Sequence, residues 1–167
     1  PPATTTLYSS SAASDVYKRQ LWDVLEHVHD PGATLTEIAR IMRPGGLLVL
    51  RVPNLASWDA RLFGDEWAGL DAPRHITVFT PRTLRQLLAQ RGFRLIDEST
   101  NIGSYPTFAL SVRFRMTANG LPQRVQSRVA AVLYHPFARL VSIPLFYVSS
   151  VMRKGPLLVV TARKPEG

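Results

Sequence analysis

Three side chains that can transfer protons or bind a cation lie within five residues of one another: Asp23, Glu26 and His27. If the backbone turns helically there, Asp23 and Glu26 are three residues apart and lie on one side. Two carboxylates beside an imidazole form a partial site for a hard divalent cation. The imidazole of His27, with an ordinary pKa of about 6.5, equally suits a general base or a donor that orients substrate.

The residues after this cluster predict a helix, a tight turn and a buried strand. Asp30 is a cap residue, Pro31 occupies the first helical turn, and apolar residues recur at helical spacing up to Met42. Pro44-Gly45-Gly46 ends the helix. Leu47 to Asn54 (LLVLRVPN) is a nearly continuous apolar run, which is typical of a strand buried on both faces of a parallel sheet.

The same order repeats further along. Ser57 to Gly64 predicts a short capped helix, and an irregular loop through His75 follows. Thr80 with Pro81 starts a second helix that ends at Gly92, and FRLIDEST then predicts another strand. Helices alternating with strands indicate an α/β fold with a doubly wound sheet.

The last third is apolar but irregular. Residues 122–152 contain a helical segment and then an apolar stretch interrupted by Pro136 and Pro144. The stretch is nearly long enough to span a bilayer, but His135, Arg139 and the prolines favour an interfacial or lid-forming helical hairpin. Gly155 to Pro165 predicts a final strand.

Charge is distributed unevenly along the chain. Residues 1–100 contain 11 Lys and Arg against 11 Asp and Glu, whereas residues 101–167 contain 9 against 1, so the net charge of +8 lies in the tail. Basic residues interleaved with apolar runs suit an anionic membrane surface at least as well as a phosphate backbone, and a solvated basic face without a partner is the third interpretation. We rank nucleic acid below the membrane as a partner.

The cysteine count and the first residues limit the possible classes. The chain has no cysteine, which excludes disulfides, thiolate metal sites and cysteine nucleophiles. Residues 1–20 lack the pattern of a secretory signal. We therefore expect a cytoplasmic protein, with a peripheral membrane location as the alternative.

The ordered blocks LWDVLEHVHDPGATLTEIARIMRPGGLLVLRVPN, ARLFGDEW, PRHITVFTPRTLRQLLAQRGF and LLVVTARK resemble the second half of class I S-adenosylmethionine-dependent methyltransferases. The resemblance spans Leu21 to Lys164 and implies a Rossmann-like sheet truncated to roughly strands four to seven. The fourth strand would end where LEHV begins, Leu47 to Asn54 would be the fifth, Phe93 to Ser99 the sixth, and Leu157 to Arg163 the antiparallel seventh.

The resemblance also implies roles for single residues. Leu21, Trp22 and Asp23 match the end of the fourth strand, which lines the cofactor pocket in that family. The D-x-x-E-H cluster is similar to the E-x-x-E-H metal cluster of O-methyltransferases that act on ubiquinone-precursor catechols and RNA 3′ ends, where His75 would match a further histidine.

Two interpretations of this cluster therefore stay open. Asp23, Glu26, His27 and His75 could together bind magnesium or manganese. Alternatively Glu26, His27 and His75 hold the loop or act on substrate without a metal, with His27 and His75 as candidate bases.

Aromatic residues follow on the segment that would cover the substrate side. Trp58 and Trp67, with Phe63 and Phe79, could form an apolar substrate wall or simply pack in the core. Trp67, between polar neighbours, is the better candidate for a substrate contact. His29 and His135 are expected to be a loop residue and a structural residue.

The front of the chain departs from the family. Residues 1–20 contain no glycine, so the glycine-rich cofactor loop is missing, and Ser10 to Gln20 resembles a translated sequencing adapter. We divide the chain into a non-native or disordered leader (1–20), the second half of the methyltransferase core (21–100), an apolar, basic helical insertion (101–155) and a final strand with its tail (156–167).

The prediction from the sequence is a methyltransferase fragment, inactive alone. Its parent would transfer a methyl group from S-adenosylmethionine to a small-molecule acceptor, most simply to oxygen. The alternative is a peripheral membrane or interaction module that works through the basic, apolar C-terminal region.

Overall fold

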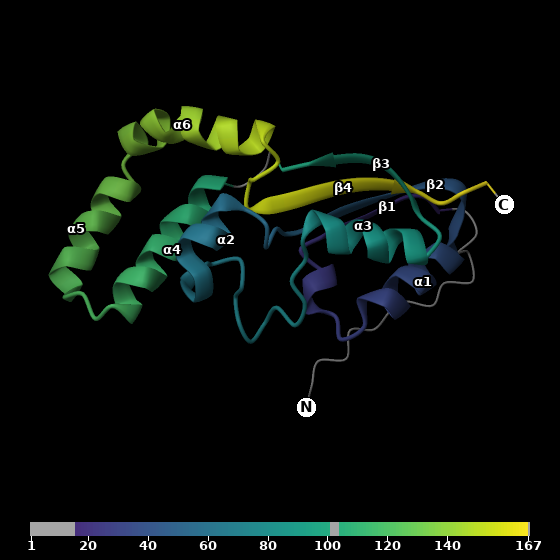
Figure 1. Cartoon of the computed structure of the whole chain (residues 1–167), viewed down its shortest axis with the longest axis horizontal. Helices are drawn as coiled ribbons and strands as arrows, with labels where there is room; N and C mark the ends of the chain where they lie inside the picture. The colour runs from purple at the N-terminus through teal and green to yellow at the C-terminus, as the bar shows by residue number, and fades with distance from the viewer. Residues whose placement is uncertain (1–15, 101–103, 167) are drawn as a thin grey trace.

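The computed structural model describes residues 16–100 and 104–166. A four-stranded sheet with two helices on it occupies one end of the molecule, and a group of helices occupies the other (Figure 1). The elements in chain order are β1 (Val16–Trp22), the 3-10 helix η2 (Leu25–His27), α1 (Pro31–Ile41), β2 (Met42–Pro53), α2 (Trp58–Phe63), the 3-10 helix η3 (Gly64–Glu66), α3 (Pro81–Gln90), β3 (Arg94–Ser99), α4 (Ser104–Ala118), α5 (Gln123–Leu133), α6 (Pro136–Val151) and β4 (Leu157–Arg163).

The sheet has the order β1-β2-β4-β3. β1 and β2 are parallel, whereas β4 runs antiparallel to both β2 and β3. The predicted α/β class and the antiparallel last strand are therefore confirmed, and β4 has the predicted bounds.

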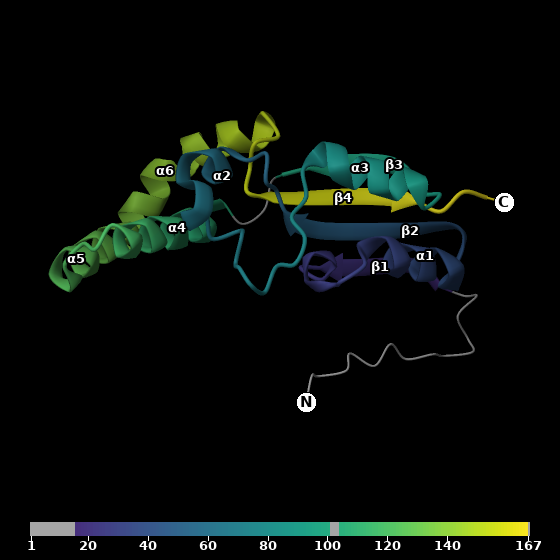
Figure 2. The same cartoon turned by 60° about the horizontal axis from the view of Figure 1, so that its bottom comes forward.

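One face of the sheet carries the main core. Leu48 and Leu50 of β2 and Val160 of β4 are buried against Leu35 of α1 and Leu84 of α3. Both helices lie on the same side of the sheet, as Figures 1 and 2 show. The residues that alternate with these on the strands are only half-buried, so the prediction that Leu47 to Asn54 is buried on both faces is wrong for the described part of the chain.

Two strands begin earlier than predicted. β2 starts at Met42, so the glycines of the predicted turn lie inside its irregular first part. β1 starts at Val16, within the segment that we excluded from the fold as a leader. Tyr17, Lys18 and Gln20 have exposed side chains there, and the pairing with β2 uses the backbone, which needs no particular residue type.

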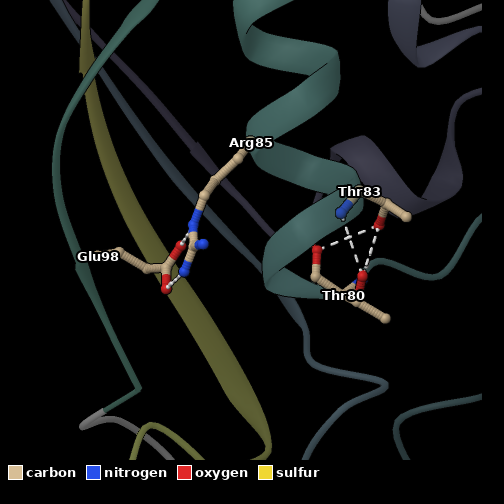
Figure 3. Close-up of polar contacts among 4 residues, drawn as sticks. All are labelled: Thr80, Thr83, Arg85 and Glu98. Atoms are coloured by element: carbon tan, nitrogen blue, oxygen red, sulfur yellow. Dashed lines mark hydrogen bonds and ion pairs between the residues drawn. The ribbon is translucent and has the colours of Figure 1, made fainter.

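Helix α3 is fixed by polar contacts at its start and along its side (Figure 3). Thr80 and Thr83 form a capping box, in which each side-chain oxygen accepts a hydrogen bond from the other residue's backbone N–H. Arg85 donates two hydrogen bonds, of 2.7 and 2.6 Å, to the carboxylate of Glu98 on β3. These contacts hold α3 against the sheet edge.

The helical group was predicted only in part. α5 and α6 occupy the segment predicted as a hairpin, and Pro144 lies inside α6 without ending it. α4 lies within the predicted helical insertion (101–155), but its bounds were not predicted. Phe63 of α2 and Phe108 of α4 meet edge to face in a second, smaller apolar cluster with Trp67.

Candidate active site

The candidate site lies where β1 and β2 end. Because these strands are parallel, their carboxyl ends meet at the same edge of the sheet, where α/β folds bind ligands. β1 ends at Trp22, so Asp23 lies just after the strand whose end it was predicted to form, and it adopts a left-handed conformation with φ 53°. This turn leads directly into η2, which carries Glu26 and His27.

Glu26 is completely buried, and neither of its carboxylate oxygens has a hydrogen-bond partner among the described residues. Its backbone carbonyl accepts hydrogen bonds from the N–H groups of Ile76 and Thr77, at 2.8 and 3.1 Å. The same residue thus joins the loop before α3 to η2. Burial raises the pKa of Glu26, and the charge of Asp23 adds to this effect.

The loop also brings His75 to His27. The two imidazole rings meet edge to face with centroids 4.7 Å apart. His27 Nδ1 lies 2.9 Å from the carbonyl of Arg74, and His75 Nδ1 lies 2.8 Å from the carbonyl of Gly69. A carbonyl only accepts, so Nδ1 carries the proton in both rings, and Nε2 of each neutral ring is left as the acceptor.

Glu26, His27 and His75 form one cluster whose ligand atoms lie within 4.8 Å of one another. A buried carboxylate beside two neutral imidazoles can accept a proton from a substrate hydroxyl. The same donors fit a divalent metal in type, since a carboxylate and imidazoles suit manganese or zinc better than magnesium. Two ligand atoms bonded to one ion at about 2.1 Å lie at most roughly 4.2 Å apart, so a cluster whose atoms all lie within 4.8 Å of one another is close to the size of a metal site.

Asp23 is not part of this cluster. Its carboxylate forms a two-bond ion pair with Arg51, which lies opposite Trp22 in the register between β1 and β2. The Arg51 guanidinium also lies over the Trp22 ring, 5.0 Å from its centroid. The four-ligand prediction is therefore wrong for Asp23, because the neighbouring strand supplies its partner.

Arg51 is the site residue that sequence reasoning missed. The signal for it was an arginine inside an otherwise apolar strand. Trp22 is 40% exposed beside it, whereas Leu21 packs against the main core. A cofactor contact by Leu21, Trp22 or Asp23 stays a prediction.

The aromatic residues predicted on the substrate side differ in how deeply they are buried. Trp67 is only 1% exposed and packs with Phe63 and Phe108, so it lies in the core of this structure, and its contact with substrate stays a prediction. Phe79 is buried in the main core, and Trp58 is half-buried. The polar residues before Trp67 indicated exposure, but α4, far along the sequence, covers its cluster.

The two remaining histidines lie outside the cluster. His29 is an exposed loop residue. The side chain of His135 accepts a hydrogen bond from the N–H of Phe137 and so caps α6. Both positions agree with the loop and structural roles predicted for them.

Comparison with known proteins adds sequence and structural relatives. Residues 20–98 match the family described as "Methyltransferase domain". A malonyl-[acyl-carrier protein] O-methyltransferase of Serratia marcescens is 32% identical over 96 residues, which cover 57% of this chain and 36% of that protein. The chain thus spans about a third of the length of this curated relative.

Solved structures share the fold at low sequence identity. The [4+2]-cyclase SpnF has a TM-score of 0.51 and 18% identity, with 95% of this chain and 55% of that chain covered. A Galdieria sulphuraria protein described as a sarcosine dimethylglycine methyltransferase has a TM-score of 0.51 and 14% identity, with 94% and 58% covered.

These likenesses indicate the fold alone, and a cyclase among them shows that the fold does not determine the reaction. The family match ends with β3, and the shared fold extends over the helical group and β4. Residues 20–98 therefore carry a match to a methyltransferase domain, and the sheet order with its antiparallel last strand agrees with the class I S-adenosylmethionine-dependent methyltransferase fold predicted from the sequence.

Proposed function

We propose that the protein to which this chain belongs transfers a methyl group from S-adenosylmethionine to an oxygen of a small-molecule acceptor. The observation that carries the proposal is the buried carboxylate of Glu26, which has no hydrogen-bond partner among the residues that the structure describes and lies beside two imidazoles at the carboxyl edge of the sheet. The curated relative is named as an O-methyltransferase, which favours oxygen as the acceptor atom.

The chemistry requires a proton acceptor beside the substrate. The acceptor oxygen attacks the methyl carbon in line, the bond from that carbon to the sulfonium sulfur breaks, and the cofactor leaves as the neutral thioether. The acceptor's proton goes to Nε2 of His27 or His75, and Glu26 stabilises the imidazolium that forms. The backbone carbonyls at Nδ1 keep both rings in the tautomer that this step needs.

Metal-assisted activation of the substrate hydroxyl is the second mechanism that the same residues allow. Glu26, His27 and His75 would hold it, and the ion would lower the pKa of a bound substrate hydroxyl. Direct proton transfer to an imidazole, argued above, needs no ion. A chelator such as EDTA separates the two: loss of activity that manganese restores would support the metal.

The cofactor side of the site is a separate part of the proposal. We place the cofactor loop outside this chain, since the chain covers 36% of the curated relative and 55% of SpnF. In the part of the chain that the structure describes, β1 pairs only with β2 and has one open edge, and the second face of the sheet is only half-buried. Isothermal titration of the 167-residue chain with S-adenosylmethionine should show no binding, and tight binding would contradict this part.

The catalytic part is tested in the longer protein, obtained by extending the reading frame upstream of Leu21. Glu26→Gln and His75→Asn should each lower methyl transfer from labelled S-adenosylmethionine by about 10²-fold or more. His29→Asn, an exposed histidine two residues from His27, is the matched control and should leave the rate unchanged.

The folding state of the variants decides how a loss of activity is interpreted. Because burial raises the pKa of Glu26, the charged carboxylate destabilises the fold at neutral pH, and the neutral amide should not lower the melting temperature. Full activity in a folded Glu26→Gln protein would refute the role of this cluster.

A further inference from the structure

Helix α6 exposes apolar side chains and buries a polar one, the reverse of a helix that packs on the core of a soluble domain. Its one buried residue is Ser149, whereas most of its large apolar side chains are exposed. Phe137 is 66% exposed, Leu140 63% and Val151 64%. The exposed apolar set of α6 consists of Phe137, Leu140, Val141, Ile143, Leu145, Tyr147, Val148 and Val151.

This apolar surface is too large to be explained as scattered exposed residues. Eight of the 16 residues of α6 belong to it, and Val132 and Tyr134, at the end of α5 and just after it, continue it. Contiguous apolar surface of this kind on a folded domain marks an interaction site. The inward side of α6, by contrast, carries small residues such as Ala138 and Ser142 together with Phe146.

Basic residues surround the apolar surface. Arg124 and Arg128 lie exposed on α5, Arg139 lies near the start of α6, and Arg153 and Lys154 follow its end. Residues 101–167 contain nine Lys and Arg and one acidic residue, Glu166, which lies beyond β4. An apolar surface framed by positive charge complements an anionic lipid surface, because the side chains enter the acyl region while the cations meet the headgroups.

A groove beside α6 provides a place for lipid headgroups. It has a volume of about 1030 Å³ and lies between α6 and the end of β3. Arg139 and Arg153 line it together with Tyr105 and Tyr134. Among the described residues that line the groove, the one carboxylate, Glu98, is already paired with Arg85, which leaves Arg139 and Arg153 as the charged groups available to a phosphate beside apolar side chains such as Leu140 and Ile143.

The helix geometry favours lying on a membrane over crossing it. No single described helix is long and apolar enough to span a bilayer, although α5 and α6 together pass on length and composition. The two helices are bent by 70° relative to each other, and both keep exposed arginines. A helix with one apolar side and flanking cations binds in the interface plane.

The surface also lies away from the β1 edge of the sheet. α6 lies at the β3 side, with Glu98 and Ser99 of β3 lining the shared groove, whereas β1 forms the opposite edge. Figure 1 shows α5 and α6 extending beyond the end of the sheet. Further strands added at β1 would therefore extend the sheet on the side away from α6.

We infer that the exposed face of α6, with the end of α5, docks the protein on membranes that contain anionic lipid. The apolar side chains enter the interface, and Arg139 and Arg153 bind lipid phosphates. This inference is independent of the methyl transfer proposed above, because it uses none of the residues of that site.

Co-sedimentation of the 167-residue chain with vesicles tests the inference. The chain should bind vesicles of phosphatidylglycerol and phosphatidylcholine, and bind pure phosphatidylcholine about tenfold or more weakly. Phe137→Ser with Leu140→Ser should lower the partition coefficient about tenfold or more. Arg139→Gln with Arg153→Gln should lower binding to the anionic vesicles and leave the weak binding to neutral ones unchanged.

A matched control uses exposed apolar residues elsewhere. Leu62→Ser with Ile96→Ser changes side chains that are 57% and 49% exposed on α2 and β3, and vesicle binding should stay as in the parent chain. Circular dichroism confirms that each variant is folded. Equal loss in the control pair, or no binding to anionic vesicles, overturns the inference.

The oligomeric state of the chain shows whether the apolar surface of α6 binds lipid or a second copy of the chain. Light scattering after gel filtration should show the same mass for the parent chain and for the Phe137→Ser/Leu140→Ser protein. A dimer that this double variant dissociates would assign the surface to a second copy of the chain and overturn the membrane assignment.

Discussion

A buried carboxyl group on α2 allows a quantitative test of the structure. Asp59 is 7% exposed, and its Oδ2 has no hydrogen-bond partner among the described residues. Burial raises the pKa of Asp59 from 3.8 to about 6. Between these values the folded protein holds a proton that the unfolded chain has already lost, so folding stability falls as the pH rises through this interval.

The size of the effect follows from the shift. Two pKa units correspond to about 3 kcal/mol, which is the cost of the buried charge well above pH 6. Below about pH 3.8 both states are protonated and the cost vanishes. Asp59→Asn removes the charge, so the variant should gain roughly 2 kcal/mol relative to the parent chain between about pH 4.5 and pH 8.

Urea unfolding followed by circular dichroism measures this gain. The free energy of unfolding of both proteins is determined at each pH, and effects of the substitution that do not depend on pH cancel in the comparison. Asp65→Asn, at an exposed position on η3, is the matched control and should show no pH-dependent gain. A difference between Asp59→Asn and the parent that is the same at both pH values would refute the burial argument.

Two further predictions concern α3 and the contacts drawn in Figure 3. Arg85→Met leaves the Glu98 carboxylate, whose side chain is 3% exposed, without its partner, and should cost about 2 kcal/mol in urea unfolding, less than for a fully buried pair because Arg85 is 46% exposed. Adding Glu98→Gln should recover most of this loss, and equal losses in the single and double variants would contradict the pairing. Thr80→Ala removes half of the capping box and should cost about 1 kcal/mol in the same assay, whereas an unchanged midpoint would show that the cap contributes nothing.

Local sequence signals predicted the elements on the sheet well. A cap with proline at the next position marked the starts of α1 and α3, and an apolar run marked β4. The bounds of α4 within the predicted helical insertion were missed because its apolar residues are spread around the whole helix and give no helical stripe. The early start of β1 was missed because backbone pairing does not depend on an apolar side-chain pattern.

The sequence predicted most residues of the candidate site, but not which of them the structure brings together. Glu26 and His27 are neighbours in sequence, and the family resemblance supplied His75. Asp23 lies outside the cluster because its carboxylate pairs with Arg51. Arg51 lies on the neighbouring strand and meets Asp23 only through the strand register. The burial of Trp67 likewise depends on α4, so the local polarity of its neighbours indicated the opposite.

The position of β4 in the sheet has a consequence for how the protein is made. β4 joins β2 to β3, and in the described sheet β3 has no other neighbour. During synthesis the ribosome therefore releases three strands whose sheet stays divided until residues 157–163 emerge. A ribosome stalled shortly before that point would leave the edges of β2 and β3 that β4 pairs without a partner. Premature release of this chain should therefore send it to chaperones or proteases, while a chain that reaches Arg163 can close its sheet in one step.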